Sequence, residues 1–99
     1  MRIISGQLKG KKILEPNDNN TRPLKDLTKE SIFNIIIHSK KFNVDIKNSK
    51  ILDLFSGVGS FGLECISRGT KKVCFVENYF GVLPILKKNL SSLKGVTNF

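Results

Sequence analysis

The feature that most constrains this chain is a glycine-spaced turn between an apolar stretch and a helical pattern. Residues 51–64, ILDLFSGVGSFGLE, begin with the aliphatic and aromatic side chains of a buried strand and then place glycines at Gly57, Gly59 and Gly62. This G-x-G-x-x-G spacing, directly after a strand and at the start of a helix, is typical of a nucleoside-cofactor site. Glycine lets a ligand approach the turn closely, and the N–H groups of the following helix point toward it.

Strands and helices alternate around this turn. We expect strands over residues 51–55 and 72–77, a helix from Gly59 or Ser60 to Arg68, and a helix over residues 82–93. Gly69 follows the first of these helices where a left-handed residue commonly ends a helix, and Pro84 lies in the first turn of the second. The tail, VTNF, is compatible with the beginning of a third strand. The alternation predicts an α/β fold with a parallel sheet.

The first half of the chain predicts a separate lead-in. Residues 2–5 and 11–14 are expected to form a β-hairpin that turns through Gly6 and Gly10. A polar loop, EPNDNNTRP, follows. We therefore expect two parts, with residues 1–49 as a basic hairpin and helix and residues 50–99 as a truncated Rossmann-like domain.

The lead-in helix is expected over residues 26–38. Its apolar stripe consists of Ile32, Phe33, Ile36 and Ile37, and the side chains expected to lie off that stripe are Lys25, Lys29 and Glu30. Asp26 is placed either as the N-cap or as a first-turn acid near the positive end of the helix dipole.

Length and cysteine usage exclude several classes of protein. A chain of 99 residues forms one compact unit at most, and its longest aliphatic run, three isoleucines, is far too short to span a membrane. No apolar block follows the N-terminal charges, so we expect no secretory signal and a cytoplasmic location. Cys65 and Cys74 lack a C-x-x-C spacing and a histidine cluster, which predicts two buried thiols and no metal site.

The net charge favours a polyanionic partner. Lysine and arginine number 17 against 8 acidic residues, a formal charge of +9. Cations that neutralise phosphates release condensed counterions, so this imbalance indicates nucleic-acid binding. The excess of lysine, isoleucine and asparagine is also what an AT-rich genome produces regardless of function, and that alternative stays open.

Two carboxylates bear on which cofactor the turn holds. Glu77, twenty residues after Gly57, is placed to accept hydrogen bonds from ribose hydroxyls. Asp53 lies in an otherwise apolar strand, where a carboxylate without a task would be costly to bury; its alternative role is to cap nearby loop N–H groups. S-adenosylmethionine has no phosphate and carries an ammonium that needs acceptors, so Asp53 favours it. A nicotinamide dinucleotide such as NAD remains the alternative.

The chain resembles the bacterial small-subunit (16S) ribosomal RNA guanine-N2-methyltransferases of the RsmD type. The resemblance covers nearly the whole chain and lies in MRIISGQLKGKKI, RPLKDLTKESIFNII, ILDLFSGVGSFGLECISRG, and VCFVEN followed by LKKNLSSL. The first two segments are the specific ones, because the third is shared by class I methyltransferases generally. The resemblance implies the N-terminal part of a class I, Rossmann-like, S-adenosylmethionine-dependent methyltransferase fold.

The same resemblance implies roles for individual residues. Around the methionine part of S-adenosylmethionine it places Asp53, Ser56, Gly57 and Gly59, while Glu77 holds the ribose and Asn78 lies beside the adenine. For contact with ribosomal RNA or the small ribosomal subunit it implies the basic lead-in residues Arg2, Lys9, Lys11, Lys12 and Arg22. It gives no catalytic residue within this chain.

One motif of the resembled family has no counterpart here. In that family an Asn/Asp-Pro-Pro-Tyr/Phe motif holds the target amine, whereas this chain contains no Pro-Pro and stops at Phe99. We therefore expect a sheet with an unpaired edge and an uncovered apolar face, self-association through that edge, and no methyl transfer by this chain alone. Two other functions stay open, an NAD-dependent oxidoreductase fragment and a non-catalytic RNA-binding remnant.

Overall fold

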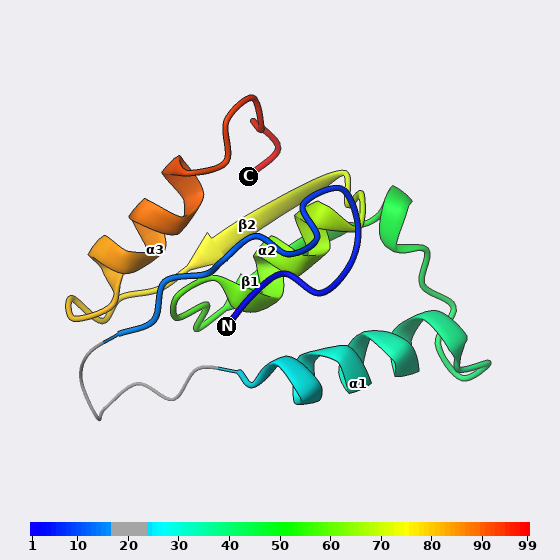
Figure 1. Cartoon of the computed structure of the whole chain (residues 1–99). Coiled ribbons are helices and arrows are strands. Elements are labelled where there is room, and N and C mark those ends of the chain that lie inside the picture. Colours follow the sequence, from blue (N-terminus) through cyan, green and yellow to red (C-terminus); the bar gives the residue numbers. More distant parts are fainter. Residues whose placement is uncertain (17–23) are drawn as a thin grey trace.

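Two parallel strands form the centre of the fold. In the computed structural model, which describes residues 1–16 and 24–99, β1 (Lys50–Leu54) pairs with β2 (Lys72–Val76), and Asp53 lies opposite Phe75 (Figure 1). Each strand ends one residue earlier than the sequence predicts. Phe55 cannot continue β1 because its φ of 56° lies in the left-handed region, and Glu77 directly follows β2 instead of closing it.

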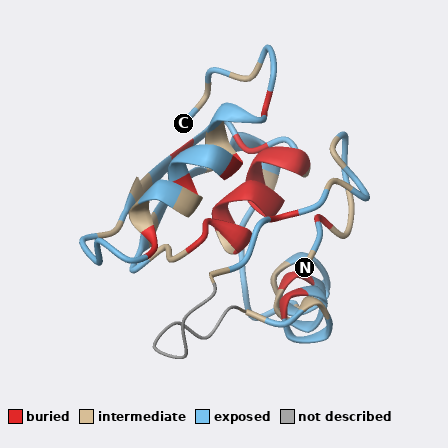
Figure 2. Ribbon diagram, turned by 60° about the vertical axis from the view of Figure 1, so that its left-hand side comes forward, coloured by how far each residue is buried: buried red, intermediate tan, exposed pale blue. Residues whose placement is uncertain are grey.

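Helix α2 (Ser60–Ser67) connects the strands and packs against one face of the sheet. Nearly all of α2 is buried (Figure 2). On that face the strands place Ile51 and Val73, and Val73 is fully buried. Gly62 is required by this packing, because an added Cβ would lie 2.2 Å from Cε1 of the Phe75 ring. The helix ends at the predicted glycine, Gly69, with a φ of 96°.

Helix α3 (Leu83–Ser91) follows β2, with Pro84 in its first turn as predicted. Its buried side chains are Leu86 and Asn89. The Asn89 amide donates to the carbonyl of Val58 at 2.8 Å and also pairs with the backbone of Leu14, so one side chain ties α3 to the glycine turn and to the lead-in.

The predicted hairpin is a loop with one antiparallel bridge, Arg2 to Lys12, instead of two strands. One reason is that α2 satisfies part of the first predicted strand: Ile4 N and Ser5 N donate to the Glu64 carboxylate at 2.8 and 3.0 Å. In the turn, Leu8 N donates to Ser67 Oγ at 2.9 Å, and Gln7 N donates to Ser67 O at 2.8 Å. Gly6 is needed at this contact, because an added Cβ would lie 2.0 Å from the Ser67 carbonyl oxygen. The lead-in therefore lies along α2.

Helix α1 (Asp26–His38) has the predicted bounds, but its buried residues are Lys29 and Phe33. Phe33 stacks on Phe61 with ring centroids 4.9 Å apart. The prediction that Lys29 lies off the buried stripe is wrong, because its ammonium is neutralised inside the protein by a carboxylate of α2. Of the predicted apolar stripe, Ile37 is exposed. Asp26 is a first-turn acid, and Lys25 occupies the N-cap position.

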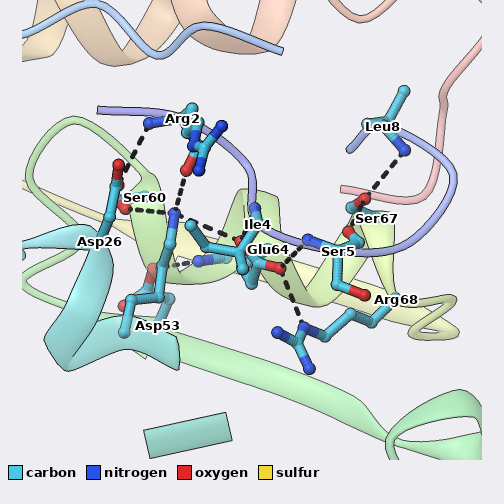
Figure 3. A network of polar contacts seen from close by, with 12 residues as sticks. Arg2, Ile4, Ser5, Leu8, Asp26, Asp53, Ser60, Glu64, Ser67 and Arg68 are labelled. Carbon is cyan, nitrogen blue, oxygen red and sulfur yellow. Dashed lines mark hydrogen bonds and ion pairs between the residues drawn. The ribbon is translucent and has the colours of Figure 1, made fainter. Parts of the chain in front are cut away.

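A buried ion network joins the lead-in, α1 and α2 (Figure 3). The Glu64 carboxylate lies 3.3 Å from Lys29 Nζ and 2.9 Å from Arg68 Nε, and both Lys29 and Glu64 are fully buried. The same carboxylate accepts hydrogen bonds from the backbone N–H groups of Ile4 and Ser5. The short 3₁₀ helix η1 (Ile46–Asn48) then leads from α1 toward β1.

The second face of the sheet carries no helix within the described residues. The side chains exposed on it are Leu52, Leu54, Cys74 and Val76. The expectation of two buried thiols is therefore half wrong: Cys65 is buried in α2, whereas Cys74 is on the open face. Residues 96–99 form no strand, although Val73 N donates to the carbonyl of Asn98 at 3.0 Å.

Two features are absent from residues 1–16 and 24–99. None of the helices there is long and apolar enough to cross a membrane. In the same residues, no three His, Cys, Asp or Glu side chains are grouped so that they could hold a metal ion. The division into parts at residue 49 stays a prediction.

Candidate functional site

The glycine turn lies at the carboxyl edge of the two strands. Ser56 holds it beside the end of β2, because its backbone N–H and its hydroxyl both donate to the Val76 carbonyl, at 3.0 and 3.2 Å. Gly57 has a φ of 58°, and an added Cβ there would meet nothing within 4 Å. The side of the turn at Gly57 is therefore open to a ligand.

The other two glycines of the motif serve internal packing. Gly59 has a φ of 90° and is buried, and an added Cβ would lie 2.8 Å from Cδ1 of Leu86 in α3. Gly62 is closed off by the Phe75 ring, as described above. Of the three glycines, Gly57 is the one that the geometry leaves available for contact with a cofactor.

Glu77 is fixed against the turn by backbone donors. One carboxylate oxygen accepts from Gly57 N at 2.7 Å, and the other accepts from Asn78 N at 3.1 Å and Tyr79 N at 3.0 Å. These hydrogen bonds, from Tyr79 first and then Gly57, lower the pKa of Glu77 below its usual value. Glu77 is therefore a carboxylate at neutral pH and links the ends of β1 and β2.

Asp53 is also tied to the backbone, but its environment is different. Its carboxylate accepts a hydrogen bond from Gly62 N at 3.2 Å, in the first turn of α2. Burial raises the pKa of Asp53, the nearby charge of Glu77 raises it further, and the Gly62 hydrogen bond opposes both. The capping role considered from the sequence is thus present, and two interacting carboxylates face the same edge of the sheet.

Exposed aromatic rings flank this edge, and the sequence analysis did not select them. Phe55 is 88% exposed and directly precedes Ser56, while Phe80 is 86% exposed and follows Glu77 by three residues. Asn78 is exposed between them. In the sequence, an aromatic residue follows each strand. The prediction had assigned Phe55 to the strand and Phe80 to a loop.

The basic residues predicted for RNA contact are spread along α2. Arg2 and Lys12 pair in the antiparallel bridge, and the Arg2 carbonyl lies 2.7 Å from Lys29 Nζ, close to the start of α2. Lys9 belongs to the turn that contacts Ser67, the last residue of the helix. Of the predicted set, Arg2, Lys9 and Lys12 are exposed, Lys11 is half-buried, and Arg22 lies outside the described residues.

Comparison with known proteins places these features in a family. The family model described as conserved hypothetical protein 95 matches residues 1–99. Ribosomal RNA small subunit methyltransferase D of Haemophilus influenzae is 42% identical over 94 residues, which cover 95% of this chain and 46% of that protein. Its Escherichia coli counterpart is 35% identical over 94 residues, covering 95% of this chain and 44% of that protein.

The fold has a matching solved structure. The provisionally assigned methyltransferase yhhF from Escherichia coli superposes with a TM-score of 0.74 at 35% identity, covering 96% of this chain and 48% of that one. The chain spans about half the length of the curated relatives it matches. The fold is accordingly that of the N-terminal part of a Rossmann-like methyltransferase. On the match over residues 1–99, the chain belongs to the conserved hypothetical protein 95 family.

Proposed function

We propose that this chain is the methyl-donor-binding part of an enzyme that methylates ribosomal RNA, with S-adenosylmethionine held at the carboxyl edge of β1 and β2. The names of the relatives from Haemophilus influenzae and Escherichia coli support a small-subunit rRNA substrate. The guanine N2 atom of 16S rRNA is the finer target that the resemblance to RsmD-type enzymes implies. S-adenosylmethionine would supply the methyl group from its sulfonium.

The pair of carboxylates at one edge carries this proposal. Burial is the largest cause of the raised pKa of Asp53, and repulsion from the Glu77 charge adds a smaller part. A cationic ligand relieves that repulsion, whereas the pyrophosphate of a dinucleotide adds to it. S-adenosylmethionine brings a sulfonium and an ammonium and no phosphate. The arrangement therefore favours S-adenosylmethionine over NAD.

The carboxylates at the edge have unused hydrogen-bond acceptor positions for such a ligand. A carboxylate offers about four lone-pair positions, and Glu77 uses three of them on backbone N–H groups. One ribose hydroxyl can take the remaining position, and a second can replace the Gly57 contact. Asp53 has one hydrogen bond in the structure, so it has free acceptor positions for an ammonium. Ser56 and Gly57 line the open side of the turn, with Asn78 beside it.

The target base is expected to be held elsewhere in the polypeptide. The three prolines of the 99 residues are not adjacent, so the base-holding motif of the resembled family is not among them. We therefore propose that donor binding is the part of the activity that these residues carry. Incubation of the purified chain with methyl-labelled S-adenosylmethionine and 16S rRNA is expected to leave the RNA unlabelled, and labelled RNA would contradict this division.

Calorimetric titration of the chain with S-adenosylmethionine and with NAD tests the proposal. We expect saturable binding of S-adenosylmethionine and no measurable binding of NAD. Asp53→Asn and Glu77→Gln should each weaken the affinity about tenfold or more, which corresponds to about 1.4 kcal/mol. Glu30→Gln, which removes an exposed acid of α1, is the matched control and should bind like the wild type.

Two outcomes would replace the proposal. Tighter binding of NAD than of S-adenosylmethionine would make the chain a dinucleotide-binding fragment. Binding of RNA with a steep salt dependence, together with no binding of either cofactor, would make it an RNA-binding remnant.

A further inference from the structure

The Lys29 ammonium contacts three groups on two segments of the molecule from one buried position. Its side chain is fully buried, and Nζ donates to the Arg2 carbonyl oxygen at 2.7 Å and to Ser60 Oγ at 3.1 Å. It also forms an ion pair with Glu64 Oε1 at 3.3 Å. Figure 3 labels these three partners, Arg2, Ser60 and Glu64. The lead-in, the first residue of α2 and the second turn of α2 therefore meet at one nitrogen.

The carboxylate of this network also has its acceptor positions filled. Glu64 accepts hydrogen bonds from the Nε of Arg68 and from the backbone N–H groups of Ile4 and Ser5, and it forms an ion pair with Lys29. Among the described residues, no buried side-chain nitrogen or oxygen lacks a hydrogen-bond partner. A shift of one segment would leave a buried charge or N–H group unsatisfied, which is costly in a medium of low dielectric constant. A displacement of one segment around Lys29 therefore disturbs the others.

Two contacts of Lys29, with Ser60 and with Arg2, connect it to the glycine turn and to the basic lead-in. Ser60 directly follows Gly59, so its hydroxyl lies at the end of the glycine turn that would hold the cofactor. Arg2 is an exposed basic residue of the lead-in, and its backbone also donates to Asp26 at 3.2 Å. Lys29 therefore lies between the glycine turn and the basic lead-in.

We propose that Lys29 is a positioning residue that couples the cofactor turn to the basic lead-in, so that a ligand bound at one raises the affinity at the other. This inference rests on the proposed function. A cofactor that fixes the glycine turn also fixes Ser60, and through Lys29 it fixes the backbone at Arg2. The coupling is reciprocal, because RNA held by the lead-in must favour the cofactor by the same factor.

Fluorescence anisotropy with a labelled 16S rRNA transcript tests this coupling in the full chain. The RNA affinity is measured without and with saturating S-adenosylhomocysteine, which cannot transfer a methyl group. We expect the ligand to tighten RNA binding about fivefold or more in the wild type, the lower end of typical coupling. Ser60→Ala removes one contact of Lys29 while leaving the Glu64 pair in place, and should reduce that factor to below about twofold.

Two further variants separate positioning from general stability. Ser91→Ala makes the same substitution at an exposed serine of α3 and should keep the wild-type coupling factor. Lys29→Arg keeps the charge and the donors, so it should retain more of the coupling than Lys29→Met. A thermal melt of each variant establishes that it is folded before its coupling is compared.

The outcomes distinguish this inference from the function on which it rests. If both ligands bind the wild type without affecting each other, the coupling is refuted and the proposed function stands. If Ser60→Ala keeps the full factor, Lys29 has a structural role alone and the inference is wrong. If S-adenosylhomocysteine does not bind at all, the proposed function fails and the inference fails with it.

Discussion

The two faces of the β1–β2 sheet differ sharply. The face toward α2 is closed, with Val73 fully buried and the Phe75 ring against Gly62. The opposite face exposes apolar side chains, and Leu52 is 60% accessible there. Both faces belong to strands of five residues with the same alternation.

This difference shows where the isolated chain obtains its stability. Burial on the closed face, together with the ion network that attaches the lead-in, accounts for the ordered core. The open face contributes little, and the carboxyl edge with Asp53 and Glu77 lies between the two. Substitutions on the closed side should therefore reduce stability strongly, and those at the edge or on the open face should act mainly on binding and association.

The largest effect is expected from Glu64→Gln on the closed side. Loss of the carboxylate leaves the ammonium of Lys29 buried without its counter-ion, which typically costs about 3–5 kcal/mol. Urea unfolding followed by circular dichroism measures the change. Lys29→Met is the comparison: it should cost less, because Glu64 keeps its pairing with Arg68. Equal losses in the two variants would show that the charges do not act as described.

A second effect on the closed face is expected from Gly62→Ala. The added methyl would lie 2.2 Å from Cε1 and 2.5 Å from Cζ of Phe75, so the ring or the helix must move at a cost of about 1–3 kcal/mol. Phe75→Leu removes those ring atoms, and the double variant should lose less than the sum of the two single ones. If the two losses add up when measured by the same urea unfolding, the strain of Gly62→Ala does not come from the Phe75 ring.

At the edge between the faces, the two carboxylates should respond to pH in opposite directions. The pKa of Glu77 is lowered, so its contribution to stability is present above about pH 4.5 and is lost as the pH falls through its folded pKa. The pKa of Asp53 is raised above 3.8, so stability falls as the pH rises from that value through its folded pKa.

Matched amide variants measure this contrast. At pH 7, Glu77→Gln should lose about 1 kcal/mol, because an amide cannot accept all three backbone N–H groups. Asp53→Asn should unfold at the same or a higher temperature while binding S-adenosylmethionine less tightly. The effect of Asp53→Asn should shrink as the pH falls below 3.8, and that of Glu77→Gln as the pH falls through the lowered folded pKa of Glu77. A destabilised Asp53→Asn at pH 7 would contradict the assignment.

The smallest effect on stability is expected on the open face. Leu52→Thr places a β-branched strand former at an accessible position, so the free energy of unfolding should change by no more than about 0.5 kcal/mol. If the open face causes self-association, the variant should sediment with a larger monomer fraction than the wild type. Leu63→Thr, at a buried position of α2, is the control and should lose about 2 kcal/mol or more.

The sequence predicted the bounds of the helices and strands better than the contacts and burial of their residues. Apolar periodicity and the glycine and proline positions predicted α1 to the residue, and α2, α3, β1 and β2 to within one or two residues. Cys74 was predicted to be buried because free cysteines usually are, and its place in a strand does not reveal whether a helix covers its face. The hairpin was overestimated because backbone N–H groups of its first strand donate to Glu64 of α2, about 60 positions away.

Prediction of the candidate site from the sequence was limited in the same way. Gly57 and Glu77 were selected from spacing, and Asp53 from the cost of burying a carboxylate in an apolar strand; the structure brings the three residues to one edge. Lys29 was missed, because a lysine beside an apolar stripe looks solvated unless its partner is known. That partner, Glu64, is 35 residues away on a different helix, and no local pattern connects the two.

The ion network also affects which part of the molecule unfolds first. It contains two cations and one anion: Glu64 lies on α2, and Arg68, four residues later, directly follows that helix. When α1 detaches, it takes the Lys29 ammonium into water and leaves a neutral pair behind. Since Phe33 is the other buried residue of α1, this helix can fray from the body as a single unit. Its amide protons should then exchange through a partial opening of the native state, well before the sheet and α2 unfold.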